Sequence, residues 1–312
     1  MEKMVAISVS DGPDLQLFGF LPQHLRRLLA SLAAATLRAG WRIGYGGDLR
    51  RDGFTRSLLA DMAAAFGRGE FQGRPQAAVV HFFALSSWRD LSVQTILEHM
   101  TDRKLGPTEA PIAPVVETRF FLKGKPAGIL PGSSTGPFVG IVVQDGALRL
   151  VETGDEIEES RFISILETAA KVPSTPGAAL TSMRRTMAAV CPLRIQFSGK
   201  IDAYQGDRPG LLEEATEQIR AGGIVMPLGA FGGAAREVAI ALGLLRAERT
   251  RYTSYGRSYQ RSFAKLAGLA EQHERQASHV WPYLQEAAGL GTPHRIVFHL
   301  NAVLAEMQRT LA

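Results

Sequence analysis

The sequence contains a single cysteine, Cys191, among 312 residues. One cysteine cannot form an internal disulfide framework or a zinc site built from several cysteines, so we expect a reducing, cytoplasmic setting. No stretch approaches the ~18 consecutive apolar residues that a membrane-spanning helix needs. The first residues turn acidic too soon to predict a secretory signal peptide, and we expect no membrane contact.

Several motifs of known chemistry are also missing from the sequence. There is no G-x-G-x-x-G dinucleotide fingerprint, no Walker A motif and no H-E-x-x-H metal motif. No G-x-S-x-G elbow is present, so a serine-hydrolase triad has no support. His273 and His279 are six residues apart, which is not a metal-ligand spacing on a helix. We therefore expect no metal site and no required cofactor, and we interpret Cys191 as a small core residue.

The composition is that of a globular protein with an excess of glycine. Hydrophobic residues make up 46% of the chain, which is enough for a sizeable core. The formal net charge is +5, which favours a small anionic ligand over a nucleic-acid coat. The 32 glycines are about 10% of the chain against a usual ~7%, and they concentrate in a few short runs.

Apolar runs and helical periodicities alternate along both ends of the chain. This alternation predicts parallel strands with helices on the faces of a sheet. Strands are expected at 5–9, 41–45, 77–83, 193–198 and 224–228, and helices at 22–39, 53–66, 209–221 and 234–245. We interpret Asp207 as the N-cap of the third helix. Ligands of such sheets bind at the carboxyl ends of the strands, where the polar and glycine-rich runs fall.

The middle and the end of the sequence are less regular. Residues 138–143 and 147–151 predict a hairpin, residues 158–171 a helix, and residues 173–177 a loop. No sustained period is found from 107 to 137. Three helices are expected at 259–276, 279–288 and 293–311. We therefore expect an α/β Rossmann-like domain over 1–250, with 84–178 as an insertion or peripheral part, and a helical C-terminal appendage over 251–312.

The run Gly229-Ala230-Phe231-Gly232-Gly233 lies between a predicted strand and a predicted helix. Glycines let backbone N–H groups approach an anion closely, and the positive end of the helix dipole favours a phosphate. The alternative is a tight strand–helix connection that binds nothing.

Two other glycine runs fit the same pattern. In Gly46-Gly47-Asp48-Leu49-Arg50, Asp48 could accept from ribose hydroxyls and Arg50 could pair with phosphate; the alternative is a turn that Asp48 caps. In 206–215, Pro209 and Gly210 open a helix that carries Glu213 and Glu214. Acidic residues in a first turn also stabilise a helix without any ligand.

Arginines alternate with tyrosines from Arg246 to Arg261. Rings stack on bases and arginines hold phosphates, so single-stranded nucleic acid is one interpretation. A lid over a bound nucleotide is another, and a solvated helix edge with buried tyrosines is a third.

Several short runs follow one another in a recognisable order and spacing: ISVSDGPDL (7–15), HL (24–25), YGGDLR (45–50), GFT (53–55), MRR (183–185), GK (199–200), YQG (204–206), PGLLEEA (209–215) and LGAFGGAA (228–235). In these runs the sequence resembles the prokaryotic LSDAT branch of the SLOG superfamily, which is related to the Lonely-guy and DNA-processing-A proteins and to the ligand-binding region of melastatin-type TRP channels. The order and spacing of the resemblance cover about 5–66 and 180–245.

The resemblance implies a nucleotide-binding fold whose ligands are nucleotides or nucleotide sugars, including ADP-ribose derivatives. It further implies a ligand sensor in an anti-phage or other conflict system, acting with a separate effector protein. In Lonely-guy phosphoribohydrolases the corresponding loop reads P-G-G-x-G-T-x-x-E. Here Arg236 stands at the position of its catalytic Glu, and Glu237 is one residue late. One residue is about 100° of helix rotation, so this departure puts glycosidic-bond hydrolysis in doubt.

We therefore expect a sensor that binds a nucleotide-derived, ADP-ribose-like ligand at the carboxyl edge of the sheet. One alternative is an N-glycosidase that uses Glu213, Glu214 or Glu237, and a second is the single-stranded nucleic-acid module. Nucleic acid is not the expected main partner, and a homo-oligomer is expected. The expected ligand-binding residues are Ser10, Asp11, Gly46, Gly47, Asp48, Arg50, Thr55, Arg184, Gly206, Pro209, Gly210, Glu213, Gly229, Phe231, Gly232, Gly233 and Arg236.

Overall fold

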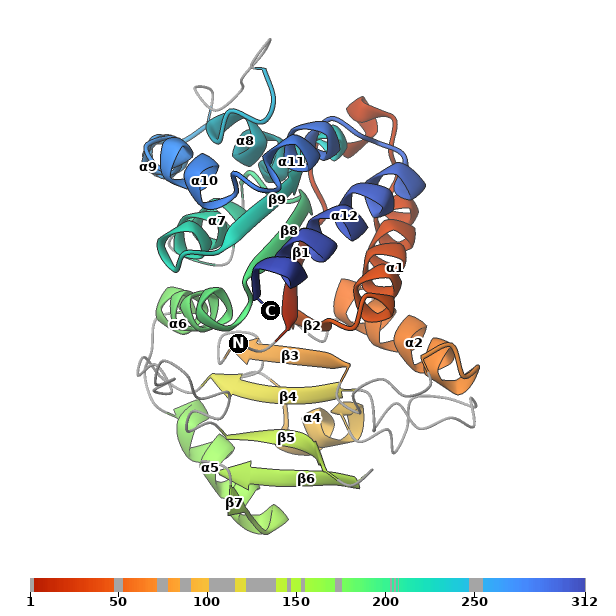
Figure 1. The fold of residues 1–312 in the computed structure, drawn as a ribbon. Coiled ribbons are helices and arrows are strands. Elements are labelled where there is room, and N and C mark those ends of the chain that lie inside the picture. The colour runs from red at the N-terminus through yellow and green to blue at the C-terminus, as the bar shows by residue number, and fades with distance from the viewer. Residues whose placement is uncertain are drawn as a thin grey trace.

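A computed structural model of the protein describes residues 3–47, 53–71, 78–84, 91–100, 116–121, 139–144, 147–152, 155–171, 176–202, 204, 206, 208–246 and 255–311. Within these residues a nine-stranded sheet runs through the molecule in the order β7-β6-β5-β4-β3-β2-β1-β8-β9 (Figure 1). Its strands are β1 (Met4–Ser10), β2 (Arg42–Gly46), β3 (Val79–Ala84), β4 (Val116–Phe121), β5 (Val139–Gln144), β6 (Ala147–Glu152), β7 (Asp155–Glu156), β8 (Leu193–Ser198) and β9 (Ile224–Leu228).

The sheet is parallel over six strands and antiparallel at one edge. Strands β4, β3, β2, β1, β8 and β9 pair in parallel, and β5 to β7 pair antiparallel. The predicted hairpin is confirmed, because β5 and β6 pair with Gln144 opposite Ala147. The mostly parallel sheet flanked by helices confirms the predicted α/β Rossmann-like fold class.

Helices cover both faces of the sheet (Figure 1). In the described part of the chain, the short 3-10 helices η1 (Leu15–Phe18) and η3 (Gly229–Phe231) lie in the connections. The α-helices are α1 (Pro22–Arg38), α2 (Phe54–Gly67), α4 (Val93–Met100), α5 (Glu159–Lys171), α6 (Pro176–Val190), α7 (Gly210–Arg220), α8 (Gly233–Ala241), α9 (Arg257–Ala267), α10 (Ala270–Gln276), α11 (Trp281–Ala288) and α12 (Pro293–Leu311).

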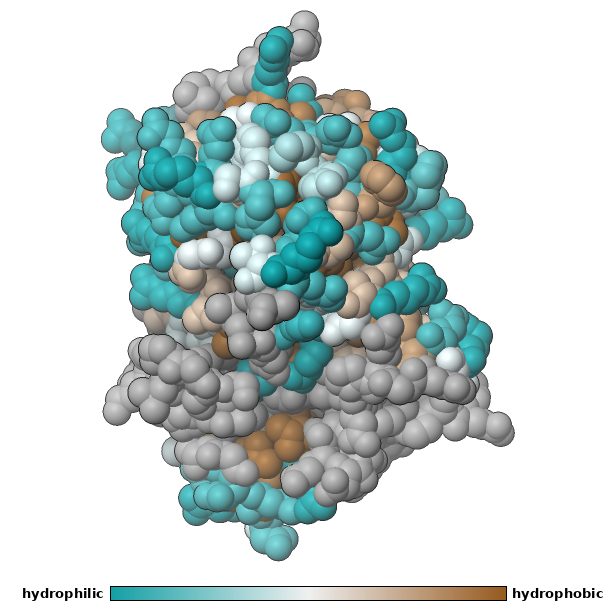
Figure 2. All heavy atoms as spheres, viewed as in Figure 1, coloured by the Kyte–Doolittle hydropathy of each residue, from teal (hydrophilic) through white to brown (hydrophobic). Residues whose placement is uncertain are grey.

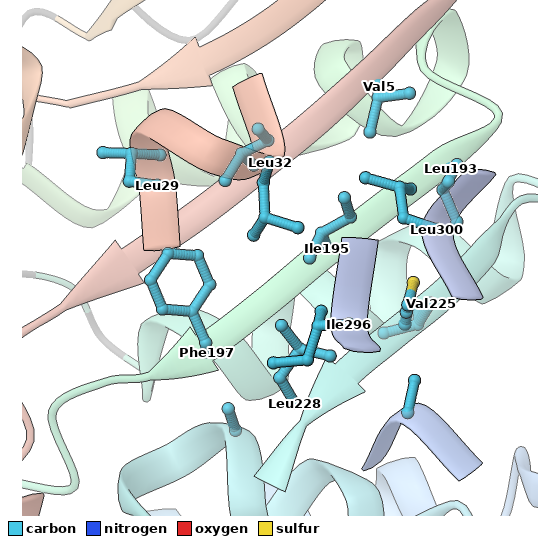
Figure 3. Packing of buried hydrophobic residues seen from close by; sticks show 14 of the residues in the cluster. Val5, Leu29, Leu32, Leu193, Ile195, Phe197, Val225, Leu228, Ile296 and Leu300 are labelled. Carbon is cyan, nitrogen blue, oxygen red and sulfur yellow. The ribbon is translucent and has the colours of Figure 1, made fainter. Parts of the chain in front are cut away.

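Alternation of side chains along β1 divides the interior into two cores. Val5 and Ile7 belong to a cluster with α1 and α12, whereas Met4 and Ala6 belong to a cluster with α6. Successive strand residues point to opposite faces, so a fully apolar strand packs against helices on both sides. Figure 3 shows the first core, where Ile195 of β8 lies between Leu32 of α1 and Ile296 of α12.

The last helix belongs to this first core. Ile296, Leu300 and Leu304 of α12 are fully buried in it, beside residues of α1 and α11. The side-chain amide of Gln308 also donates to the carbonyl of Ala39, over 2.8 Å. The apolar face of α12 is thus buried within the chain and does not offer a surface to a second copy. The oligomeric state stays a prediction.

Helices α4 and α6 and strand β4 are the longest elements that were not predicted from the sequence. Helix α6 replaces part of the predicted loop at 173–177 and continues to Val190, although Pro176 and Gly177 begin it. Its apolar residues Leu180, Met183 and Met187 repeat at helical spacing and are buried. Strand β4 lies in the segment 107–137, which shows no sustained period. Helix α4 lies in a segment for which no element was predicted.

Some helix ends also differ from prediction. Pro209 is the N-cap of α7, so the interpretation of Asp207 as N-cap is wrong; Asp207 itself lies outside the described residues. The helix expected over 259–276 is two helices, since α9 ends before Gly268 and α10 begins at Ala270. Helix α8 ends at Ala241, before Gly243 with its φ of +73°.

Candidate functional site

The parallel sheet changes its direction of winding between β1 and β8. From β1 the chain adds β2 and β3 on one side, and β8 and β9 extend the sheet on the other. In doubly wound sheets, ligands bind outside the carboxyl ends of the strands at this switch point. Ser10, the last residue of β1, pairs in register with Ser198, the last residue of β8. Two serines therefore mark the centre of the candidate site.

Ser198 has an unusual backbone conformation and an unpartnered hydroxyl. Its φ is +57°, and it is the one residue other than glycine with positive φ among the described residues. Its side chain is fully buried, and its Oγ has no hydrogen-bond partner. A non-glycine residue in this region costs roughly 1–2 kcal/mol and is commonly found at functional sites. The sequence analysis missed Ser198, because nothing in the run FSGK reveals its φ.

The turns after β1 and β8 are joined by backbone contacts. The amide of Gly199 donates to the carbonyl of Ser10 over 2.9 Å, and the amide of Lys200 donates to the Ser10 hydroxyl over 3.1 Å. A Cβ atom at Gly12 would lie 2.7 Å from the Ser198 Oγ. A side chain at Gly12, two residues after β1, would therefore press on the Ser198 hydroxyl. The expected site residue Asp11 lies between Ser10 and Gly12 and is exposed.

The turn at Gly229–Gly233 closes against the same two strands. Gly232 and Gly233 have φ of +69° and +62°, and a Cβ atom at Gly233 would lie 2.5 Å from the Gly199 carbonyl oxygen. The amide of Ala234 donates to that carbonyl over 3.0 Å. The structure thus brings Gly232 and Gly233 together with the ends of β1 and β8.

The start of α8 already has an anion in the structure. The buried carboxylate of Asp14 accepts from the Gly233 amide over 2.8 Å. A carboxylate at a helix N-terminus is stabilised by the helix dipole, as a phosphate would be. A phosphate at this position would have to displace Asp14 from Gly233.

The remaining residues of this turn have different environments. Gly229 and Phe231 are buried, and the Phe231 ring packs 4.5 Å from the Phe20 ring. Arg236 is half-buried, and its guanidinium lies over the Phe18 ring at 5.1 Å. Arg236 is therefore a cation held near the carboxyl edge by an aromatic contact.

Tyr259 of α9 and Glu237 of α8 add buried polar groups near this edge. The Tyr259 hydroxyl is buried and unpartnered. Burial, followed by the charges of Glu237 and Asp14 and the neighbouring Tyr255, raises the pKa of Tyr259 far above its ordinary value. Its hydroxyl therefore stays protonated and can donate. The sequence analysis treated Tyr259 as part of the basic stretch only.

The glycines after β2 pack closely on side chains. A Cβ atom at Gly47 would collide with the Thr55 hydroxyl, and one at Gly46 would lie 2.9 Å from the Met183 methyl group. The His81 ring holds this turn through the Gly47 carbonyl, with Nε2 at 3.0 Å. Thr55, expected in the site, is buried here. Asp48 and Arg50 lie outside the described residues.

Arg184 and Glu213 form an ion pair between α6 and α7 rather than presenting free charges. Arg184 donates to one Glu213 oxygen, and the Thr181 hydroxyl donates to the other over 2.6 Å. Glu214 lies 3.5 Å from Arg184 and 3.1 Å from Arg194. Two of the three candidate catalytic carboxylates are therefore neutralised by arginines.

Two further expected site residues, Gly206 and Gly210, border this ion pair. A Cβ atom at Gly206 would lie 3.5 Å from an Arg184 guanidinium nitrogen, and one at Gly210 would lie 3.1 Å from another. Pro209, which lies between these glycines in the sequence and was also expected in the site, is buried. Arg194 extends the network to the Ser8 hydroxyl on β1, over 2.8 Å. This arginine–glutamate network fixes α6 and α7 on the sheet beside the candidate site.

A family model described as SLOG cluster2 matches residues 1–114 and 143–287. The chain belongs to this SLOG family. The match reaches beyond the runs that carried the resemblance and includes helices α9 and α10. The LSDAT branch stays a prediction.

Membership in a SLOG cluster family suggests a nucleotide-related ligand-binding or processing role. No curated protein matches the chain. Among the described residues of this SLOG chain, no group of three His, Cys, Asp or Glu side chains could hold a metal ion. No helix in the described part is long and apolar enough to span a bilayer.

Proposed function

We propose that this SLOG protein is a sensor that binds a nucleotide-derived, ADP-ribose-like ligand at the carboxyl ends of β1 and β8. The buried, unpartnered Ser198 hydroxyl at the switch point is the observation that carries the proposal. A buried polar group without a partner costs free energy, which a bound ligand can recover by accepting its hydrogen bond.

The groups around Ser198 suit a phosphate-bearing ligand with hydroxyls. The Tyr259 hydroxyl is a second buried donor without a partner, and half-buried Lys200 and Arg236 supply positive charge near the edge. Asp14 and Glu237 are carboxylates that can accept from ribose hydroxyls. We propose that such a sensor acts in an anti-phage or other conflict system, through a separate effector.

Binding without turnover is proposed for a specific reason. A glycosidase needs a carboxylate that is available to the substrate. Glu213 and Glu214 are engaged by Arg184 and Arg194, and the position that corresponds to the Lonely-guy catalytic Glu is Arg236. Glu237 is the remaining carboxylate of the alternative, and it is buried on α8.

The ligand can be identified by mass spectrometry of small molecules that co-purify with the protein, followed by calorimetry with ADP-ribose and the compound found. Ser198→Gly removes the hydroxyl and relieves the positive φ, whereas Ser198→Ala removes the hydroxyl and keeps the strained φ. Both variants should lose affinity by about 10-fold, since one hydrogen bond contributes roughly 1.5 kcal/mol. Thermal unfolding should show Ser198→Gly to be no less stable than Ser198→Ala.

Incubation with ADP-ribose, NAD and nucleoside monophosphates separates the sensor from the enzyme. We expect no released base from any of them. Turnover that disappears in Glu214→Gln or Glu237→Gln would overturn the sensor proposal in favour of the glycosidase. Unchanged affinity in both Ser198 variants would mean that the ligand does not bind at the switch point.

A further inference from the structure

Helix α9 exposes a straight row of positive charge. Arg257, Arg261 and Lys265 are exposed and recur at every fourth residue, so they lie on one face at intervals of about 6 Å. The helix reads RSYQRSFAKLA and contains no acidic residue. Like charges at this spacing destabilise a helix, so the row has a cost that nothing on α9 offsets.

Three more cations gather around the end of this row. Arg185 of α6 and Arg220 of α7 are exposed, and both contact the Glu217 carboxylate, at 3.2 and 3.8 Å. Arg208 precedes α7 and is also exposed. Burial, followed by the nearby charges of Arg220 and Arg208, lowers the pKa of Lys265 despite the opposing effect of Glu217. We call these six cations the α9 cationic patch: Arg185, Arg208, Arg220, Arg257, Arg261 and Lys265.

The α9 cationic patch contains more cations than paired carboxylates. In the described part of the chain, its cations form ion pairs with one carboxylate, Glu217, through Arg185 and Arg220. On the adjoining α10, Glu271 is paired with Arg275 at 3.8 Å. In Figure 2 the surface at the upper left, where Figure 1 draws α9 and α10, is hydrophilic, as are other parts of the face shown.

The patch offers charge without apolar anchors. Among the described residues, the exposed large hydrophobic side chains are Leu17, Leu21 and Phe298, and none of them lies on α6, α7 or α9. Protein interfaces are centred on buried aromatic or aliphatic anchors, which this surface does not provide. A phosphate backbone needs cations and hydroxyls alone, and arginine forks fit phosphate in a bidentate way.

The tyrosines of this region do not supply base stacking. Tyr259 is buried, and half-buried Tyr255 packs edge-on against it with ring centroids 4.8 Å apart. Sequence-tolerant binding of single strands uses exposed rings as stacking platforms. The described part of the stretch around 246–261 therefore presents charge to solvent and keeps its rings inside.

We propose that the α9 cationic patch binds the phosphate backbone of nucleic acid through charge, without reading bases. Nucleic acid was not the main partner expected from the sequence. The cations of the patch are exposed, whereas Ser198 and Tyr259 of the proposed ligand site are buried. The proposal is independent of the proposed function. A nucleotide sensor that also binds nucleic acid would be held near its source of ligand or near its effector.

The test is fluorescence anisotropy of the full chain with a labelled 20-base-pair DNA duplex and its labelled single strand. Six phosphate contacts on the duplex should weaken binding by about 10³-fold between 50 and 200 mM salt. The triple variant Arg257→Glu, Arg261→Glu, Lys265→Glu removes three contacts, so it should bind more weakly at 50 mM salt, and its affinity should fall only ~40-fold between 50 and 200 mM. The single variant Arg261→Gln should reduce the salt slope by about 0.9.

The matched control reverses three exposed cations on other elements, with the substitutions Arg27→Glu, Lys171→Glu and Arg295→Glu. It changes the net charge by the same amount and should retain most of the affinity. Circular dichroism shows whether each variant is folded, and Arg261→Gln keeps the test valid if the triple variant is not. Equal losses in patch and control, or no binding at 50 mM salt, would each overturn the proposal.

Discussion

Two regions, the switch point and the arginine–glutamate network between α6 and α7, hold their elements together by different physical means. At the switch point, the ends of β1 and β8 and the start of α8 meet through glycines, with Gly233 packed on the Gly199 backbone. Between α6 and α7, the arginine–glutamate network holds the elements through long charged side chains. At the switch point, Gly233 packs so closely on Gly199 that a Cβ atom would not fit. Between α6 and α7, the charged side chains of the arginine–glutamate network occupy the space between the elements.

The difference shows what a glycine-rich turn signifies. Gly229–Gly233 and Gly46–Gly47 were both interpreted as places where a ligand phosphate meets backbone amides. In the structure the close approach at Gly233 is to the protein's own backbone, and the anion at α8 is Asp14. Glycine marks close approach, and the sequence does not reveal whether the approaching group is a ligand or another strand.

The largest effect is expected from a methyl group at the backbone contact. Gly233→Ala should lower the free energy of unfolding by about 4 kcal/mol, because it combines a positive φ (roughly 1–2 kcal/mol) with overpacking against the Gly199 carbonyl (roughly 1–3 kcal/mol). Urea unfolding monitored by circular dichroism measures this loss.

The matched control is Gly243→Ala. Gly243 has a similar φ of +73° and nothing within 4 Å of its would-be Cβ. It should cost only the conformational part, about 1 kcal/mol. Equal losses in the two variants would show that backbone packing at the switch point contributes nothing beyond φ.

The next largest effect concerns the arginine–glutamate network. Glu213→Ala leaves buried Arg184 with Glu214 alone at 3.5 Å, and it should cost about 3–4 kcal/mol. The double variant Arg184→Met, Glu213→Leu removes both charges and should recover most of that loss, because a well-packed apolar pair can replace a buried ion pair. A double variant as unstable as Glu213→Ala would mean that this region, like the switch point, tolerates one arrangement only.

A third, uncharged contact extends the comparison to the edge strand. The Val225 amide donates to His273 Nε2 over 3.0 Å, and burial lowers the pKa of His273 to about 4. Histidine in the unfolded chain titrates near 6.5, so on acidification the unfolded state binds a proton first. Stability from this group is complete above pH 6.5, and about 3 kcal/mol of it should be lost between pH 6.5 and 4.

The variant His273→Gln isolates this effect, since glutamine can accept from the Val225 amide but does not titrate. Unfolding curves at several pH values should show a smaller acid loss for the variant than for the native protein. The difference between the two curves should be concentrated between pH 4 and 6.5. Parallel curves would assign the acid sensitivity to other groups.

Most of the fold could be predicted from the sequence because its central strands are short apolar runs. The runs at 5–9, 193–198 and 224–228 are β1, β8 and β9 within one or two residues. Helix α6 was missed because Pro176 and Gly177 begin it, and these residues more often mark a loop. Strand β4 lies close to a proline-rich segment, so its pattern was obscured by its surroundings.

The candidate site was predictable as an edge but not as a set of contacts. Chain order places Ser10 and the Gly229–Gly233 run at strand ends, and parallel pairing brings these ends together. The φ of Ser198 and the buried Tyr259 hydroxyl depend on tertiary packing, which periodicity does not encode. Glu213 was expected to face a ligand, and its true partner Arg184 lies 29 residues away in the sequence.

The smallest effect is expected at Asp14, a charged side chain that binds the glycine turn at the start of α8. Asp14→Asn keeps an oxygen that can accept from the Gly233 amide but removes the charge at the start of α8. It should cost about 1 kcal/mol, and less at high salt because the dipole interaction is screened. Exposed Asp11→Asn, three residues earlier, should be almost neutral. A gain in stability for Asp14→Asn would instead mean that the charges of Glu237 and Asp14 repel each other. The charge of Asp14 would then serve the binding of a ligand, since it would not stabilise the fold.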